Sequence, residues 1–178
     1  RMIKAEVPRL DNLTLPEILY SIACVERGLI LVTGTTGSGK STTLAALINY
    51  MNETMNRHII TIEHPIEFVH RDKNSIITQR EVGFDTESFY KALVAAMRQN
   101  PDVILIGEMR DAETVDAALA AVETGHLVLS TLHTVNAAHT INRILEFYPK
   151  DHHDQLRSQL AEYLIATISQ RLVPRADG

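Results

Sequence analysis

The chain alternates short runs of apolar and β-branched residues with longer segments in which apolar residues recur every three or four positions. The short runs predict buried strands, and the longer segments predict helices with one apolar face. The predicted strands span residues 29–33, 58–63, 76–79, 103–107 and 127–131, and the predicted helices span residues 40–55, 86–99, 112–124, 137–147 and 154–173. This alternation is typical of an α/β fold with a mostly parallel sheet flanked by helices.

One more helix is predicted near the amino terminus. Thr14 is the predicted N-cap, Glu17 would complete a capping box, and Gly28 would end the helix before the first strand. Residues 1–13 are expected to form an extended strand or linker that follows a further, amino-terminal domain. Residues 14–178 are then expected to form one globular domain of a longer protein.

The composition of the chain disfavours several kinds of partner and metal site. The 178 residues carry a formal net charge of -5, with 5% aromatic residues and no Trp, which disfavours a basic, base-stacking groove for nucleic acid. The single Cys24 has no partner for a disulfide and suits a reducing cytoplasm. No histidine pair has convincing zinc spacing and thiolate ligands are lacking, so no zinc site is expected. No apolar run is long enough to cross a membrane.

The strongest chemical motif is a phosphate loop. Residues 34–41 read G-T-T-G-S-G-K-S, which matches G-x-x-x-x-G-K-[ST] directly after an apolar strand. A strand, a glycine turn and a helix beginning at Lys40 aim several backbone N–H groups at one anion. Lys40 is predicted to reach the β- and γ-phosphates of ATP, and Ser41 to bind Mg²⁺. The predicted nucleotide-binding residues are Gly34, Thr35, Thr36, Gly37, Ser38, Gly39, Lys40, Ser41 and Thr42.

Two carboxylates follow predicted strands at the edge of the sheet where ligands bind. Glu108 follows strand 103–107 at the Walker-B position, with Gly107 where many phosphate-loop enzymes have Asp. Glu108 is predicted to polarise the attacking water and to steady Mg²⁺ through bound water. Glu63 ends strand 58–63 as a second active-site candidate, and an ion pair in the loop is its alternative interpretation.

Histidines and arginines give weaker candidates. His133 lies two residues past strand 127–131, where it would sense a γ-phosphate, whereas His126 precedes that strand and by itself suggests a structural histidine. A positive clamp for the γ-phosphoryl group is often supplied by a neighbouring subunit. Its candidates are Arg80, Arg98, Arg110 and Arg143, each with a surface ion pair as the alternative.

Missing motifs reduce the number of reaction classes. The chain has no N-K-x-D guanine-reading motif, which disfavours a GTPase, and no L-S-G-G-Q segment of transporter ATPases. A kinase would need an arginine-rich lid, for which residues 151–157 are only a loose candidate. The acidic balance disfavours a helicase. Hydrolysis coupled to the movement of a partner is the simplest interpretation.

Five segments occur together in the order of a known family: residues 33–43, 61–67, 79–83, 101–111 and 123–134. Over nearly its whole length the chain resembles the type II/type IV secretion ATPases, most closely the PilT/PilU-like retraction motors of type IV pili. The resemblance implies a RecA-like P-loop NTPase core in a hexameric ATPase. It also implies a cytoplasmic location on an inner-membrane pilus platform protein, and a role in pilus retraction and twitching motility.

The resemblance also assigns residues. It implies Glu108 as the Walker-B base, Glu63 in the family's acidic box, and His126 and His133 in its histidine box, which makes His126 a catalytic candidate despite its position before the strand. In two places the chain departs from the family pattern. His64 stands where the acidic box usually has Asp, so Glu63 is expected to act more alone, and Thr35 replaces the usual Pro or Ala.

Two alternative functions stay open. Assembly-type and type II secretion relatives carry a four-cysteine zinc module soon after the segment that matches residues 169–173, and Pro174–Gly178 follow here without Cys, which favours retraction. A non-hydrolysing, nucleotide-gated assembly module would keep Lys40 and tolerate the loss of Glu108. The family's carboxyl-terminal helical part is expected to lie outside this chain, which alone is expected to bind nucleotide and hydrolyse it slowly.

Overall fold

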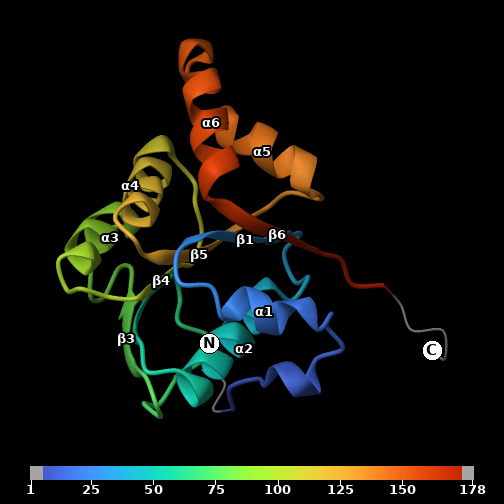
Figure 1. The fold of residues 1–178 in the computed structure, drawn as a ribbon, viewed down its shortest axis with the longest axis vertical. Helices are drawn as coiled ribbons and strands as arrows, with labels where there is room; N and C mark the ends of the chain where they lie inside the picture. Colours follow the sequence, from blue (N-terminus) through green and yellow to red (C-terminus); the bar gives the residue numbers. More distant parts are fainter. Residues whose placement is uncertain (1–5, 174–178) are drawn as a thin grey trace.

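A six-stranded parallel sheet forms the centre of the computed structural model, which describes residues 6–173 (Figure 1). The strands are β1 (Gly28–Gly34), β2 (His58–Glu63), β3 (Ile76–Glu81), β4 (Val103–Ile106), β5 (Leu127–Leu132) and β6 (Leu164–Gln170). Their order is β3-β2-β4-β5-β1-β6, and every neighbouring pair is parallel. The carboxyl ends of all six strands therefore meet at one edge of the sheet, which confirms the predicted fold class.

Helices cover both faces of the sheet (Figure 1). They are α1 (Ile18–Ala23), α2 (Lys40–Thr54), α3 (Phe89–Met97), α4 (Ala112–Glu123), α5 (Ala137–Leu145) and α6 (His153–Tyr163), with 3-10 turns η1 (Leu10–Asn12) and η2 (Lys150–His152). Alternate residues of β1 enter different cores. Leu29 and Leu31 pack with the helices α3 to α6, whereas Ile30 and Val32 pack with α1 and α2. Burial on both faces explains why β1 reads as one continuous apolar run.

The last predicted helix is wrong in its second half. Residues 154–173 were expected to be helical, but α6 ends at Tyr163 and β6 follows it. Ile165, Thr167 and Ile168 are β-branched and favour an extended backbone. Pairing with β1 gives their backbone groups partners along a strand edge that would otherwise be open, and it brings Gln170 opposite Gly34.

The predicted capping box at the amino terminus is also wrong. Helix α1 begins at Ile18, and Glu17 has helical backbone angles and no side-chain cap bond. Thr14 is left out because the chain turns tightly there, with Leu15 N donating to Leu13 O. Helix α1 ends at Ala23, and Gly28 instead begins β1.

The remaining predicted elements lie within three residues of their observed boundaries. Residues 1–5 of the predicted extended strand or linker lie outside the described residues, and within residues 6–13 the turn η1 buries Leu10 against the core that contains α2. The domain boundary at residue 13 stays a prediction. Within residues 6–173, none of the helices combines the length and the apolar character that crossing a membrane requires.

Candidate functional site

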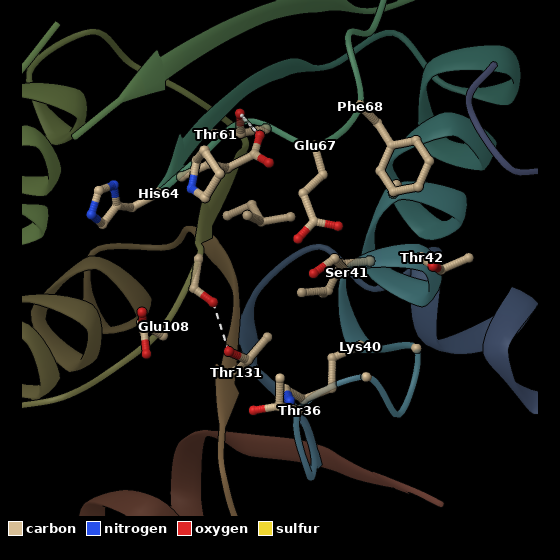
Figure 2. Close-up of a pocket in the computed structure, with 18 of the residues that line it drawn as sticks. Thr36, Lys40, Ser41, Thr42, Thr61, His64, Glu67, Phe68, Glu108 and Thr131 are labelled. Atoms are coloured by element: carbon tan, nitrogen blue, oxygen red, sulfur yellow. Dashed lines mark hydrogen bonds between the residues drawn. The ribbon is translucent and has the colours of Figure 1, made fainter. Parts of the chain in front are cut away.

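A pocket of about 490 Å³ opens at the carboxyl edge of the sheet (Figure 2). It lies where β1, β2, β4 and β5 end and where α2 begins. Its floor is the phosphate loop, and its walls are the segments that follow β2, β4 and β5. The predicted site residues that line it are Thr36, Gly37, Gly39, Lys40, Ser41, Thr42, Glu63, Glu108 and His133.

The backbone shape of the phosphate loop requires glycine at two positions. Gly39 caps α2 with φ +94°, in the left-handed region that favours glycine. Gly34 has φ +148°, and a Cβ on it would lie 2.4 Å from the Gln170 carbonyl oxygen and 2.5 Å from Ser38 Oγ. The first N–H groups of a helix have no partner inside the helix, so the start of α2 presents donors to an anion.

Lys40 is folded back onto the loop. The residue is 8% exposed, and Nζ donates to the carbonyl oxygens of Gly34 at 2.9 Å and Thr35 at 3.0 Å. Burial lowers the pKa of Lys40, while the negative charge of Glu108 opposes that shift. A phosphate in the pocket would replace the two carbonyl oxygens as the partner of the ammonium group.

Three predicted loop residues lie outside this pocket. Gly34, Thr35 and Ser38 line a separate cavity of about 530 Å³ that also contacts Gln170 at the end of β6. Ser38 is buried, and its Oγ has no hydrogen-bond partner among the described residues. These three residues therefore line the other cavity and do not border the pocket that contains Lys40.

The oxygen atoms of the pocket suit Mg²⁺. Figure 2 shows the Ser41 hydroxyl and the Glu67 carboxylate facing each other across the pocket. Within residues 6–173, no group of three or more His, Cys, Asp or Glu side chains is placed to hold a metal ion by itself. Mg²⁺ prefers few protein oxygens together with waters and substrate phosphates, so the donor set fits this ion: Ser41 would be a direct ligand and Glu108 would act through water.

Glu63 is held firmly at the end of β2. Its Oε1 accepts hydrogen bonds from Thr61 Oγ1 at 2.7 Å and from Gln79 Nε2 at 3.1 Å. Burial raises the pKa of Glu63, and the charge of Glu67 acts in the same direction, whereas the two side-chain donors oppose the shift. His64 follows with an exposed side chain that also borders the pocket.

Glu108 follows β4 with a side chain that is 14% exposed. It forms an ion pair with Arg110, and His133 Nε2 lies 3.8 Å from its Oε2. Gly107 explains the missing Asp, because a Cβ there would lie 3.2 Å from the Ile62 carbonyl oxygen, closer than most real contacts. The close approach of β2 therefore leaves Glu108 as the first side chain after β4 that reaches the pocket.

The other predicted arginines do not reach this pocket. Arg80 donates to Gln99 Oε1 at 3.2 Å, and Arg143 pairs with Glu146 at 2.8 Å while its guanidinium lies over Phe147. Arg98 is the C-cap of α3. Of the four predicted arginines, Arg110 is the one that pairs with a pocket residue, Glu108, and the clamp role of all four stays a prediction.

His126 lies at the amino end of β5, away from the pocket. Its Nδ1 is 2.8 Å from the Ala121 carbonyl oxygen and 3.1 Å from Thr124 Oγ1, at the end of α4. The chain thus brings His133, but not His126, to its own phosphate loop. The catalytic role predicted for His126 therefore stays a prediction that this placement does not support within a single chain.

Sequence reasoning missed several residues that line the pocket. Glu67 and His70 come from the loop after β2, and Thr131 donates from β5 to the Gly107 carbonyl oxygen at 2.6 Å. The rule that ligands bind beyond strand ends would have found Thr131, which is the last but one residue of β5. Glu67 belongs to segment 61–67, but it lies four residues after Glu63, the last residue of β2. The rule for strand ends therefore did not predict it.

Comparisons with known proteins agree with this geometry. The sequence model described as "Type II/IV secretion system protein" matches residues 13–178. A twitching motility protein of Neisseria gonorrhoeae is 56% identical over the whole chain, which covers 48% of that relative. The pilus retraction ATPase PilT of Pseudomonas aeruginosa is 51% identical over the whole chain, which covers 52% of it.

A solved structure of the pilus retraction motor PilT with bound ADP is 54% identical and superposes with a TM-score of 0.96, over all of this chain and 52% of the other. The VirB11 ATPase of Brucella suis, at 23% identity and a TM-score of 0.67, shares the fold. The chain spans about half the length of the curated relatives it matches. It has a P-loop NTPase fold and belongs to the type II/IV secretion system protein family.

Proposed function

We propose that this chain binds ATP with Mg²⁺ and hydrolyses it as the motor domain of a type IV pilus retraction ATPase. One observation carries the proposal: the phosphate loop and the carboxylates of Glu63 and Glu108 border a single pocket. The bound ADP of the related PilT structure supports a nucleotide at this place. Phosphate-binding donors and a carboxylate for water in one pocket are the parts that hydrolysis needs.

The phosphates bind over the start of α2. Backbone N–H groups of the loop point at the β-phosphate, and the helix dipole favours its charge. Lys40 leaves the carbonyl oxygens of Gly34 and Thr35 and donates to the β- and γ-phosphates. Ser41 supplies a hydroxyl ligand for Mg²⁺, which when bound neutralises charge on the phosphate oxygens.

Glu108 prepares the attacking water. Water oxygen bonds to the γ-phosphorus, its proton goes to Glu108, and the bond from the γ-phosphorus to the bridging oxygen breaks to give ADP and phosphate. His133 stands beside Glu108 to sense the γ-phosphate. Because Arg110 pairs with Glu108 here, the carboxylate must first exchange that partner for the water.

Relatives support retraction over the alternatives. Identity is 56% to the twitching motility protein and 51% to PilT, but 44%, over 150 residues, to a type II secretion system protein E of Xanthomonas campestris. The proposal includes a hexameric ring that works in the cytoplasm on an inner-membrane platform protein. It includes no nucleic-acid partner and no zinc.

The test is Glu108→Gln in the full-length protein. This change keeps the shape of the side chain but removes its ability to take a proton, so ATP turnover should fall at least about 100-fold while ATP affinity stays within about twofold. Steady-state phosphate release and fluorescent-nucleotide titration measure the two quantities. Lys40→Ala is the comparison variant, for which both turnover and binding should be lost.

Unchanged turnover in Glu108→Gln would refute the assigned base. The alternative is that the wild-type protein binds nucleotide but shows no turnover above that of Lys40→Ala. That result would instead support the nucleotide-gated assembly module. Loss of twitching, with normal surface pili, in cells that carry Glu108→Gln would separate retraction from assembly.

A further inference from the structure

Gln79, on the edge strand β3, connects the carboxylate of Glu63 to the wall of the pocket. Strand β3 runs parallel to β2, with Gln79 opposite Thr61. Gln79 belongs to segment 79–83, one of the segments that carry the family resemblance, but no role was predicted for it. This inference rests on the proposed function, since it concerns the carboxylates of the same site.

Both polar atoms of the Gln79 amide are used. Nε2 donates to Glu63 Oε1 at 3.1 Å and to the Phe68 carbonyl oxygen at 3.0 Å. Oε1 accepts from the His70 backbone N–H at 2.8 Å. Only a primary amide can donate to a carboxylate and a carbonyl while accepting from a backbone N–H.

These contacts fix one oxygen of the carboxylate. Thr61 Oγ1 and Gln79 Nε2 both donate to Glu63 Oε1, from two different strands. Two donors on one oxygen set the rotation of the carboxylate group about its last bond. The orientation of Glu63 in the pocket therefore depends on Gln79 as well as on its own strand.

The same strand also holds the loop that follows β2. Glu81, two residues after Gln79, accepts a hydrogen bond from the Ile66 backbone N–H at 2.9 Å. Glu67 and His70 of this loop border the pocket. Gln79 and Glu81 thus fasten the loop at its two ends, and the Gln79 amide joins the loop to Glu63.

We infer that Gln79 is a positioning residue that orients the Glu63 carboxylate and couples it to the pocket loop 66–70. Gln79 does not border the pocket itself, so its effect on hydrolysis acts through Glu63. A misplacement of a catalytic group by about 1 Å can cost on the order of 100-fold in rate.

Two variants test the inference in the full-length protein. Gln79→Leu removes every polar contact, whereas Gln79→Glu keeps an acceptor for the His70 N–H and loses both donations. In both, kcat should fall roughly 10- to 100-fold while affinity for ADP changes little, and the thermal unfolding midpoint should fall modestly because partly buried polar groups lose their partners. Gln159→Leu is the matched control, because Gln159 is a half-buried glutamine on α6 that does not line the pocket, and this variant should keep wild-type kcat.

A double-mutant cycle separates positioning from general damage. In a Glu63→Gln background, Gln79→Leu should change the residual turnover by less than about twofold, because the group that it orients is already gone. Independent, multiplying losses would overturn the inference, and so would a parallel loss of ADP binding and folding in both Gln79 variants.

A readout without turnover separates this inference from the proposed function. The ¹³C carboxyl resonance of Glu63, assigned by its loss in Glu63→Gln, should shift in Gln79→Leu and stay in place in Gln159→Leu. An unmoved resonance in Gln79→Leu would overturn the positioning role, whether or not the wild-type protein hydrolyses ATP. Absent turnover in the wild-type protein would count only against the proposed function.

Discussion

Gly34 allows β6 to approach the phosphate loop closely. A Cβ at this residue would meet the Gln170 carbonyl oxygen at 2.4 Å, and backbone oxygen cannot move aside as a flexible side chain can. Gly34→Ala should therefore destabilise the fold by roughly 2–4 kcal/mol, from overpacking and from its positive φ. Urea unfolding followed by circular dichroism measures the change.

Gly125→Ala is the matched control for Gly34→Ala. Gly125 also has a positive φ, of +100°, but a Cβ there would meet nothing within 4 Å. It should cost only the backbone strain of about 1–2 kcal/mol. Equal losses in the two variants would show that the approach of Gln170 is not what requires Gly34.

His70 should make stability depend on pH. Burial lowers the pKa of His70 to about 4, with the charge of Lys73 adding to the shift, and its Nδ1 has no hydrogen-bond partner among the described residues. Since an unfolded histidine has a pKa near 6.5, the unfolded state binds more protons between these two values, and stability falls as the pH drops through that window. The loss should be at most about 3–4 kcal/mol, which is the free energy that corresponds to the full difference between the two pKa values.

Unfolding free energies at pH 7 and pH 4.5 measure this effect. In His70→Gln the difference between the two free energies should shrink, because a neutral amide cannot take up the proton. The same slope in the variant and the wild-type protein would assign the acid sensitivity to other groups.

At the scale of elements, helix α5 depends on its N-cap. Asn136 accepts a hydrogen bond from the His139 backbone N–H at 2.9 Å. Asn136→Ala should cost about 1 kcal/mol of unfolding free energy. Asn142→Ala, on the exposed part of the same helix, removes an asparagine without removing a cap and should change stability little. Thermal unfolding of the two variants compares them, and equal midpoints would contradict the cap's contribution.

Local signals in the sequence predicted most elements and failed where a distant partner decides. The phosphate loop was predicted because its strand, turn and helix start are contiguous in sequence. β6 was missed because residues 164–170 have no turn before them, and only the open edge of β1 makes them a strand. Thr14 is not an N-cap because the backbone turns at Leu13–Leu15 and helix α1 begins only at Ile18.

The site follows the same division. Lys40, Ser41, Glu63 and Glu108 stand at strand or helix ends, so the topology alone predicted that they meet, and they do line one pocket. Gln79 could not be found this way, because its role comes from a cross-strand neighbour and a loop that packs back on β3. Long side chains such as arginine are equally hard to place from sequence, since their direction depends on tertiary packing.

At the scale of the whole molecule, the described residues supply the phosphate loop and carboxylates to the pocket, but few positively charged side chains. Apart from Lys40, Arg110 is the predicted cation beside the pocket, and it pairs with Glu108. His126 lies at the opposite edge of the sheet, before β5, and does not line the pocket. A γ-phosphoryl transition state needs a positive clamp, so we expect that clamp to come from outside this set of residues.

Turnover per chain should therefore rise with protein concentration as rings form, whereas nucleotide binding should not. A clamp from another copy raises the rate of hydrolysis on the order of 10³-fold. The isolated chain should therefore hydrolyse ATP at least about 100-fold more slowly than a chain within an assembled ring. Light scattering and phosphate release, measured at the same concentrations, test this, and constant turnover while the mass grows would contradict it.

A mixture of Glu108→Gln chains with chains that carry Arg143→Ala tests whether one arginine acts across copies. An intact base and an intact arginine can then meet at some interfaces, so activity should return in the mixture only if Arg143 acts across copies; Arg80 and Arg98 can be tested in the same way.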